Sequence, residues 1–150
     1  MSEINGLLIG CNGRGVQDSS LQKPVSLQEP SIEEQFRLVK RSGMFDFFDR
    51  LPLPGQEELF RDCIDRYQLP VHTTSRLYEL GSDEPLIQRN IKAAAAVGAD
   101  IHNMMVYSHR ADGKQVTDQE VVDAYLYAYD EGMKQGVEPS FELHVNMWSE

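Results

Sequence analysis

LPVHTTSRLYELGSDEPLIQRNIKAAAAVGAD, residues 69–100, contains one repeat of the pattern that runs through the whole chain. A short apolar run at residues 69–73 comes first, and apolar residues then recur at helical spacing as far as Gly98. Ser82 or Asp83 stands where a helix N-cap is expected, and Pro85 is suited to the first helical turn. The stretch therefore predicts a strand followed by a helix.

The same alternation continues on both sides of this stretch. Ser31 with Glu34, and Thr117 with Glu120, have the spacing of a capping box at a helix start. The expected strands are residues 4–10, 44–48, 69–73, 101–107 and 141–148, and the expected helices are about 31–43, 56–67, 82–98 and 117–136. Strands that alternate with helices form βαβ units and a parallel sheet. We therefore predict an α/β fold with about five strands and four helices.

The number of units leaves two folds open, because four and a half βα units make either an open doubly wound sheet or slightly more than half a barrel. One βα unit takes roughly 30 to 40 residues, and a complete barrel of eight units needs about 250. A domain seldom ends on a strand that no helix covers, because such a strand is an exposed edge. We interpret residues 1–150 as the N-terminal portion of a single parallel (β/α)8 barrel domain, that is, a truncated TIM barrel.

Net charge, the length of apolar runs and cysteine content narrow the possible partners and cellular location of the protein. A formal net charge of -10 at pH 7 repels a nucleic-acid backbone or an anionic membrane, so we expect neither as a partner. No run approaches the roughly 18 apolar residues of a membrane span. Cys11 and Cys63 are far apart and lie in no CxxC pattern, which favours reduced thiols in a cytoplasmic protein.

The run at residues 141–148, FELHVNMW, alternates strictly between apolar and polar side chains. In a strand, one face then carries Glu142, His144, Asn146 and Trp148. Both faces of a parallel strand are normally apolar. An acid, an imidazole and an amide in succession therefore predict a ligand site at the mouth of the barrel, although a solvated strand face gives the same pattern.

Other candidate residues lie at the same expected rim. His72 ends the expected third strand and His109 follows the fourth, so we expect both close to Glu142. Imidazole and carboxylate groups are ligands for Zn²⁺, Mn²⁺ or Mg²⁺, but each histidine alone is as well explained by a structural hydrogen bond. Arg14, in the loop after the first strand, can meet a substrate phosphate or carboxylate, or simply be solvated. His102, at the start of its strand, is interpreted as structural.

These motifs resemble a known family. The segment LPVHTTSRLYELGS, the helix ending AAAAVGAD, the strand before His109 and the strand with Glu142 are similar to the xylose isomerase-like barrel superfamily. The resemblance implies a metal-dependent isomerase or epimerase that acts on a sugar or sugar phosphate through an enediolate. Glu142 would bind the divalent ion and take part in catalysis together with His144. Asn146, Trp148 and Arg14 would bind substrate.

Two alternatives stay open at this point. The endonuclease IV branch of the superfamily is a phosphodiesterase that uses strand-end histidines, which would match His72 and His109, although the acidic charge disfavours DNA. A non-catalytic half-barrel is the other alternative. Its uncovered fifth strand predicts homo-oligomerisation or aggregation.

Overall fold

The computed structural model describes residues 6–13, 30–142, 147 and 148. The chain divides into two compact units, residues 1–72 and 73–150, and each is described by itself. The first unit contains β1 (Gly10–Asn12), α1 (Ile32–Ser42), β2 (Phe47–Asp49) and α2 (Glu57–Tyr67). The second contains β3 (Thr73–Tyr78), α3 (Glu84–Ala96), β4 (Ile101–Val106), α4 (Asp118–Gln135) and β5 (Glu138–Phe141). The predicted α/β class, with five strands and four helices among the described residues, is confirmed.

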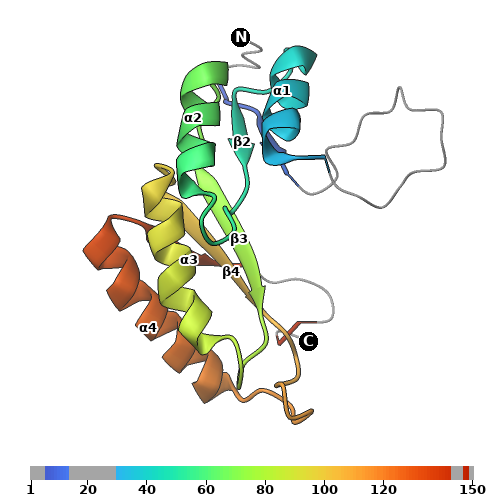
Figure 1. Cartoon of the computed structure of the whole chain (residues 1–150). Coiled ribbons are helices and arrows are strands. Elements are labelled where there is room, and N and C mark those ends of the chain that lie inside the picture. Colours follow the sequence, from blue (N-terminus) through green and yellow to red (C-terminus); the bar gives the residue numbers. More distant parts are fainter. Residues whose placement is uncertain (1–5, 14–29, 143–146, 149–150) are drawn as a thin grey trace, which may run out of the picture. The chain divides into compact units, whose positions relative to one another are not determined.

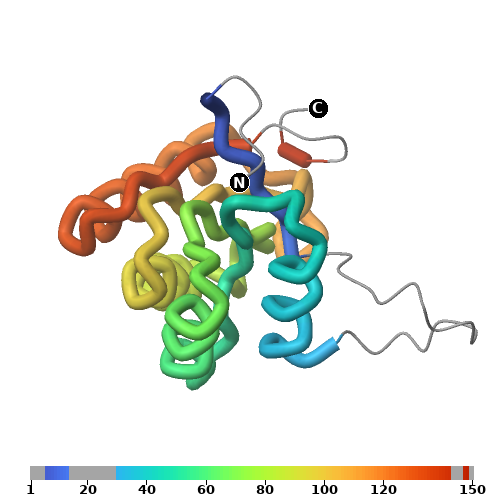
Figure 2. The backbone as a smooth tube through the Cα atoms, turned by 90° about the horizontal axis from the view of Figure 1, so that it is seen from above, coloured from blue at the N-terminus to red at the C-terminus, as the bar shows by residue number. Residues whose placement is uncertain are grey.

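The first unit is built around an aromatic core. β1 and β2 pair in parallel, and α1 and α2 lie side by side (Figure 1 and Figure 2). Phe36 of α1 is fully buried, and its ring meets Phe48 and Phe60 edge-on at centroid distances of 4.8 Å and 5.6 Å. Edge-to-face contacts of this kind add to the free energy gained by burying the rings.

The second unit is a parallel sheet in the order β3-β4-β5. α3 and α4 lie side by side (Figure 1), with α3 in contact with β3 and β4 and α4 in contact with β5. Asn90 of α3 donates to the Tyr78 hydroxyl of β3, and the Tyr125 hydroxyl of α4 donates to the Pro139 carbonyl of β5, at 3.0 Å. Both helices therefore cover the same face of the sheet.

The helix ends follow the local sequence signals. The Ser31 hydroxyl accepts a hydrogen bond from the Glu34 backbone N–H, and Thr117 and Glu120 form the expected capping box. Capping is a local interaction between residues three apart, so it does not depend on the rest of the fold. The four predicted helices are confirmed with small differences at their ends.

Three strands lie elsewhere than predicted. β1 begins at Gly10, where the first predicted strand ends, and β5 ends at Phe141, where the fifth begins. β3 begins at Thr73, so the prediction that His72 closes the third strand is wrong: His72 precedes β3. The first four residues of β3, at positions 73–76, are polar, so a search for apolar runs does not find the start of this strand. Thr74 can be buried there because its hydroxyl forms a hydrogen bond with His102 of β4.

Within the described ranges, no helix combines the length and the apolar character that a membrane crossing requires.

Replacing Gly132 with Ala is expected to force α4 away from β5. A Cβ there would lie 2.3 Å from the Val137 carbonyl oxygen and 2.8 Å from the Pro139 ring. Since a backbone carbonyl cannot rotate aside, we expect Gly132→Ala to lower the free energy of unfolding by about 1–3 kcal/mol, measured by urea unfolding. Gln135→Ala, at an exposed position of the same helix, is the control. A stabilised Gly132→Ala variant, as helix propensity alone would give, would contradict the close contact.

Candidate functional site

A row of polar side chains crosses the sheet face that points away from α3 and α4. Ser75, Asn103 and Ser140 stand opposite one another in register on β3, β4 and β5. Glu142 lies two residues beyond Ser140, directly after β5, and so shares this face. We call Ser75, Asn103, Ser140 and Glu142 the polar row.

The carboxylate of Glu142 is oriented by Asn103, and Asn103 is in turn oriented by Ser140. The Asn103 side-chain amide donates from Nδ2 to Glu142 Oε2. The Ser140 hydroxyl donates to Asn103 Oδ1 at 3.1 Å and so fixes the amide that orients the carboxylate. The backbone N–H of Glu142 donates to the Met104 carbonyl at 2.9 Å. Main chain and side chain of this half-buried residue are therefore both positioned.

This arrangement has a defined but limited chemical capacity. A fixed carboxylate can bind a hard divalent cation through oxygen or accept a proton from a substrate. Among the residues that the structure describes, no three His, Cys, Asp or Glu side chains gather closely enough to hold a metal ion. Glu142 is thus suited to be one ligand of such an ion, and the described residues do not complete the set.

The structure does not add His109 to the polar row. His109 lies three residues beyond the end of β4 and is exposed. Its Nδ1 is 3.0 Å from the Ser108 hydroxyl, and its backbone forms a bridge with Gln115. These contacts belong to the loop between β4 and α4.

His72 lies in the first unit, so the structure does not set its position relative to Glu142. Its ring meets Phe47 edge-on at 5.1 Å, and its backbone N–H donates to Asp49 Oδ1 at 3.2 Å. The grouping of His72 with Glu142 and His109 stays a prediction.

The predicted orientation of Trp148 is wrong. Its indole packs edge-on against Phe141 at 5.9 Å, and its Nε1–H donates to Asp118 at the start of α4. Phe141 in turn contacts Tyr125 of α4, so Trp148 lies on the helix side and not beside Glu142. The alternation of side chains between the two sheet faces, which placed Trp148 beside Glu142, does not hold here, because Met147 forms an antiparallel bridge with Tyr107 and does not extend β5.

Three further candidates, Arg14, His144 and Asn146, lie outside the described residues. Their assigned roles stay predictions.

Sequence reasoning missed Asn103 and Ser140. Asn103 interrupts the apolar run IHNMMV of β4, and an amide inside a buried strand is the signal that points to it. Ser140 lies two residues before Glu142 on the same face, and a polar alternation starting at Glu138 would have included it.

A buried hydrogen-bond network lies on the opposite, helix-covered face. His102 is fully buried, with Nδ1 at 2.8 Å from Thr74 Oγ1 and Nε2 at 2.7 Å from the Tyr78 hydroxyl. Burial lowers the pKa of His102 to about 4 and raises the pKa of Tyr78 to about 12. Both side chains are therefore neutral at neutral pH, and the contacts of His102 are those expected of a structural residue.

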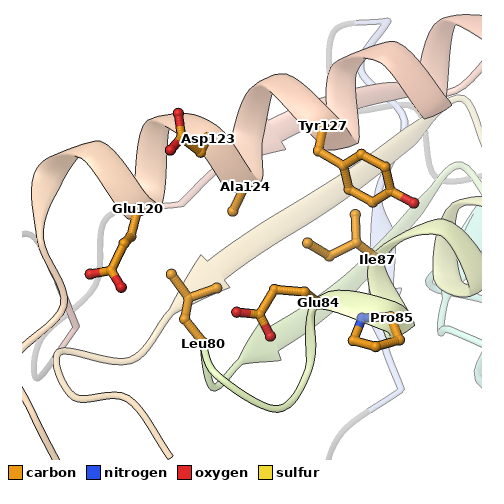
Figure 3. A pocket seen from close by; sticks show the side chains of 8 residues that line it. All are labelled: Leu80, Glu84, Pro85, Ile87, Glu120, Asp123, Ala124 and Tyr127. Atoms are coloured by element: carbon orange, nitrogen blue, oxygen red, sulfur yellow. The ribbon is translucent and has the colours of Figure 1, made fainter.

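A cavity of about 480 Å³ opens between the first turns of α3 and α4. Figure 3 shows Leu80, Ile87 and Ala124 along its apolar part, with Glu84 and Glu120 beside them. It lies on the helix side of the sheet, so it is separate from the polar row. Its three carboxylates have local partners: Glu84 accepts from the Gly81 N–H, Glu120 caps α4, and Asp123 accepts from the Gln119 side chain.

Several solved structures are similar to this chain. The D-allulose 3-epimerase from Methylomonas sp. in complex with D-allulose matches with a TM-score of 0.68 and 13% identity, over 94% of this chain and 53% of that chain. An L-ribulose 3-epimerase matches with a TM-score of 0.63 and 15% identity, over 93% and 50%. An AP endonuclease of family 2 from Brucella melitensis matches with a TM-score of 0.60 and 13% identity, over 90% and 55%.

The likeness is one of fold. The chain spans about half the length of each of these structures, and over the part that it matches it shares their fold of parallel strands alternating with helices. The resemblance predicted from the sequence is thereby confirmed at the level of the fold. No family model matches the chain, and no curated protein does.

Proposed function

We propose that this chain contributes Glu142 to the active site of a metal-dependent isomerase or epimerase of sugars or sugar phosphates. The observation that carries the proposal is the half-buried carboxylate directly after β5, oriented by Asn103. Catalytic residues of (β/α) barrels lie at this end of the strands. The similar structures named as D-allulose and L-ribulose 3-epimerases support a small sugar-like substrate.

The proposed chemistry is proton transfer beside a carbonyl. A base removes a proton from the carbon next to the substrate carbonyl, and the resulting enediolate is reprotonated. A divalent ion, Mn²⁺, Mg²⁺ or Zn²⁺, would supply polarisation of that carbonyl when bound. Asn103 engages Oε2 of Glu142, and within the part of the chain that the structure describes Oε1 is available to bind the ion or to accept the proton.

Two observations favour this proposal over a phosphodiesterase. The net charge of -10 repels DNA. His109, which the phosphodiesterase would need beside the carboxylate, has its contacts within its own loop. The sequence supports three further proposals: residues 1–150 are the N-terminal portion of one barrel, the protein is cytoplasmic, and it forms homo-oligomers.

Metal removal tests the proposal. We expect the protein that carries this chain to epimerise or isomerise a ketohexose or ketopentose, or its phosphate. EDTA should abolish turnover, and Mn²⁺, Mg²⁺ or Zn²⁺ should restore it, as measured by chromatography of the products. Turnover that chelation leaves unchanged would overturn the metal dependence. No turnover of any of these sugars with any of the three ions would overturn the proposed reaction.

A further inference from the structure

The two oxygens of the Glu142 carboxylate have different surroundings. Asn103 Nδ2 donates a hydrogen bond to Oε2, whereas within the described ranges no side chain donates to Oε1. The orientation of the Asn103 amide is fixed in turn, because its Oδ1 accepts from the Ser140 hydroxyl at 3.1 Å. An amide turned the other way would place Oδ1, an acceptor, against the carboxylate. Oε2 is therefore engaged by the protein itself, and Oε1 is the oxygen that can meet a ligand.

The group that orients Glu142 is neutral. An amide leaves the carboxylate its full negative charge, whereas Lys or Arg at position 103 would compensate the charge that attracts a cation. Asn103, Ser140 and Glu142 are all half-buried, so water competes less for their hydrogen bonds than at an exposed surface. The Glu142 backbone N–H also donates to the Met104 carbonyl, at 2.9 Å, which fixes the main chain. The carboxylate therefore keeps its charge and is held in one orientation.

A carboxylate that offers one oxygen discriminates between hard cations. Mg²⁺ demands a near-ideal octahedron of oxygen ligands, keeps several waters and takes few protein oxygens. Ca²⁺ accepts more ligands in a flexible geometry and often takes both oxygens of one carboxylate. The hydrogen bond from Asn103 competes with binding of an ion by Oε2. Asn103 therefore disfavours the two-oxygen mode that suits Ca²⁺.

We propose that Asn103, held by Ser140, is a positioning residue that makes Glu142 a one-oxygen ligand and so selects Mg²⁺ over Ca²⁺. The proposal rests on the proposed function, because it takes Glu142 to be a ligand of the divalent ion. It adds the selectivity of the site and assigns that selectivity to two residues that do not themselves touch the ion.

Replacing Asn103 with Ala tests the proposal through metal binding alone. Mg²⁺ and Ca²⁺ are each titrated into the protein that carries this chain, without substrate, by isothermal titration calorimetry. Loss of the orienting bond should weaken Mg²⁺ binding by about tenfold or more. Ca²⁺ should lose less, because Oε2 becomes free to bind it, and the ratio of Ca²⁺ to Mg²⁺ affinity should rise by about tenfold. A merely structural role of Asn103 would lower both affinities equally and leave this ratio unchanged.

Variants of the two serines locate the effect. Ser140→Ala lets the Asn103 amide turn over, so it should raise the same ratio by a smaller factor. Ser140→Thr keeps the hydroxyl and should keep the wild-type ratio. Ser75→Ala is the matched control: Ser75 is in register with Asn103 but on β3, so that β4 separates it from Glu142, and its ratio should not change. Circular dichroism confirms that each variant is folded.

The outcomes separate this inference from the proposed function. If Glu142→Gln weakens Mg²⁺ binding but neither Asn103→Ala nor Ser140→Ala changes the ratio, the selectivity inference is overturned and Glu142 remains a ligand. Equal changes of the ratio in Asn103→Ala and Ser75→Ala would also overturn it. Binding of Mg²⁺ by Glu142→Gln as tight as by wild type, or binding of neither ion by wild type, would overturn both.

Discussion

Replacing Glu142 with Gln is expected to lower kcat/KM by on the order of 10³-fold in the protein that carries this chain. Glutamine has the shape of glutamate and can still accept the hydrogen bond from Asn103 Nδ2, so the polar row should keep its geometry. The variant lacks the negative charge that binds a divalent ion or takes a proton. Steady-state kinetics with metal analysis measure both effects.

Glu138→Gln is the matched control for this substitution. Glu138 is the first residue of β5, lies on the same sheet face as Glu142 four residues earlier, and is exposed. We expect its variant to keep wild-type kcat/KM and metal content. A Glu142→Gln variant with wild-type turnover and bound ion would show that Glu142 neither binds the metal nor acts as a base.

Helices were predictable from the sequence because their signals are local. Ser31 and Thr117 each bond a residue three positions away, and the sequence contains both members of each pair. Strand positions depend on partners distant in the chain. Thr74 belongs to β3 because it pairs with His102, 28 residues later, and no local signal distinguishes it from a loop threonine.

The candidate site was likewise predictable only where its signal is local in the sequence. Glu142 could be recognised because it begins a series of acid, imidazole and amide side chains that alternate with apolar ones, which is unusual for a parallel strand. Its orienting partner could not, because the contact with Asn103 depends on the register between β4 and β5, across 39 residues. The error at Trp148 has a related cause, since the antiparallel bridge between Met147 and Tyr107 joins residues 40 positions apart and cannot be read from the local alternation.

One arrangement of protons gives every group in the network around His102 a partner. In this arrangement Tyr78 accepts from Asn90 Nδ2 and donates its own proton to Nε2 of His102. Nδ1 of His102 then carries the proton and donates to Thr74 Oγ1. Protonating Nε2 would leave two donors, Nε2–H and the Tyr78 hydroxyl, facing each other in a buried site. Burial therefore favours the neutral ring.

Lowering the pH from 7 to 4 should consequently destabilise the fold through His102. Its pKa falls from the ordinary 6.5 to about 4 in the folded state, so between these values only the unfolded chain binds the proton. The stabilisation that the lowered pKa of His102 contributes to the folded state is fully present above pH 6.5 and is lost progressively toward pH 4. At about 1.4 kcal/mol per pH unit the loss amounts to roughly 3 kcal/mol.

Urea unfolding at a series of pH values, followed by fluorescence of Trp148, measures this loss. Carboxylates also titrate toward pH 4, so the comparison is between variants. His102→Gln lacks the titrating ring and should show a shallower decline than wild type between pH 6.5 and 4. His109→Gln makes the same change at an exposed histidine and should follow the wild-type curve. If all three proteins lost stability in parallel, the buried ring of His102 would not be the group that binds the proton on unfolding.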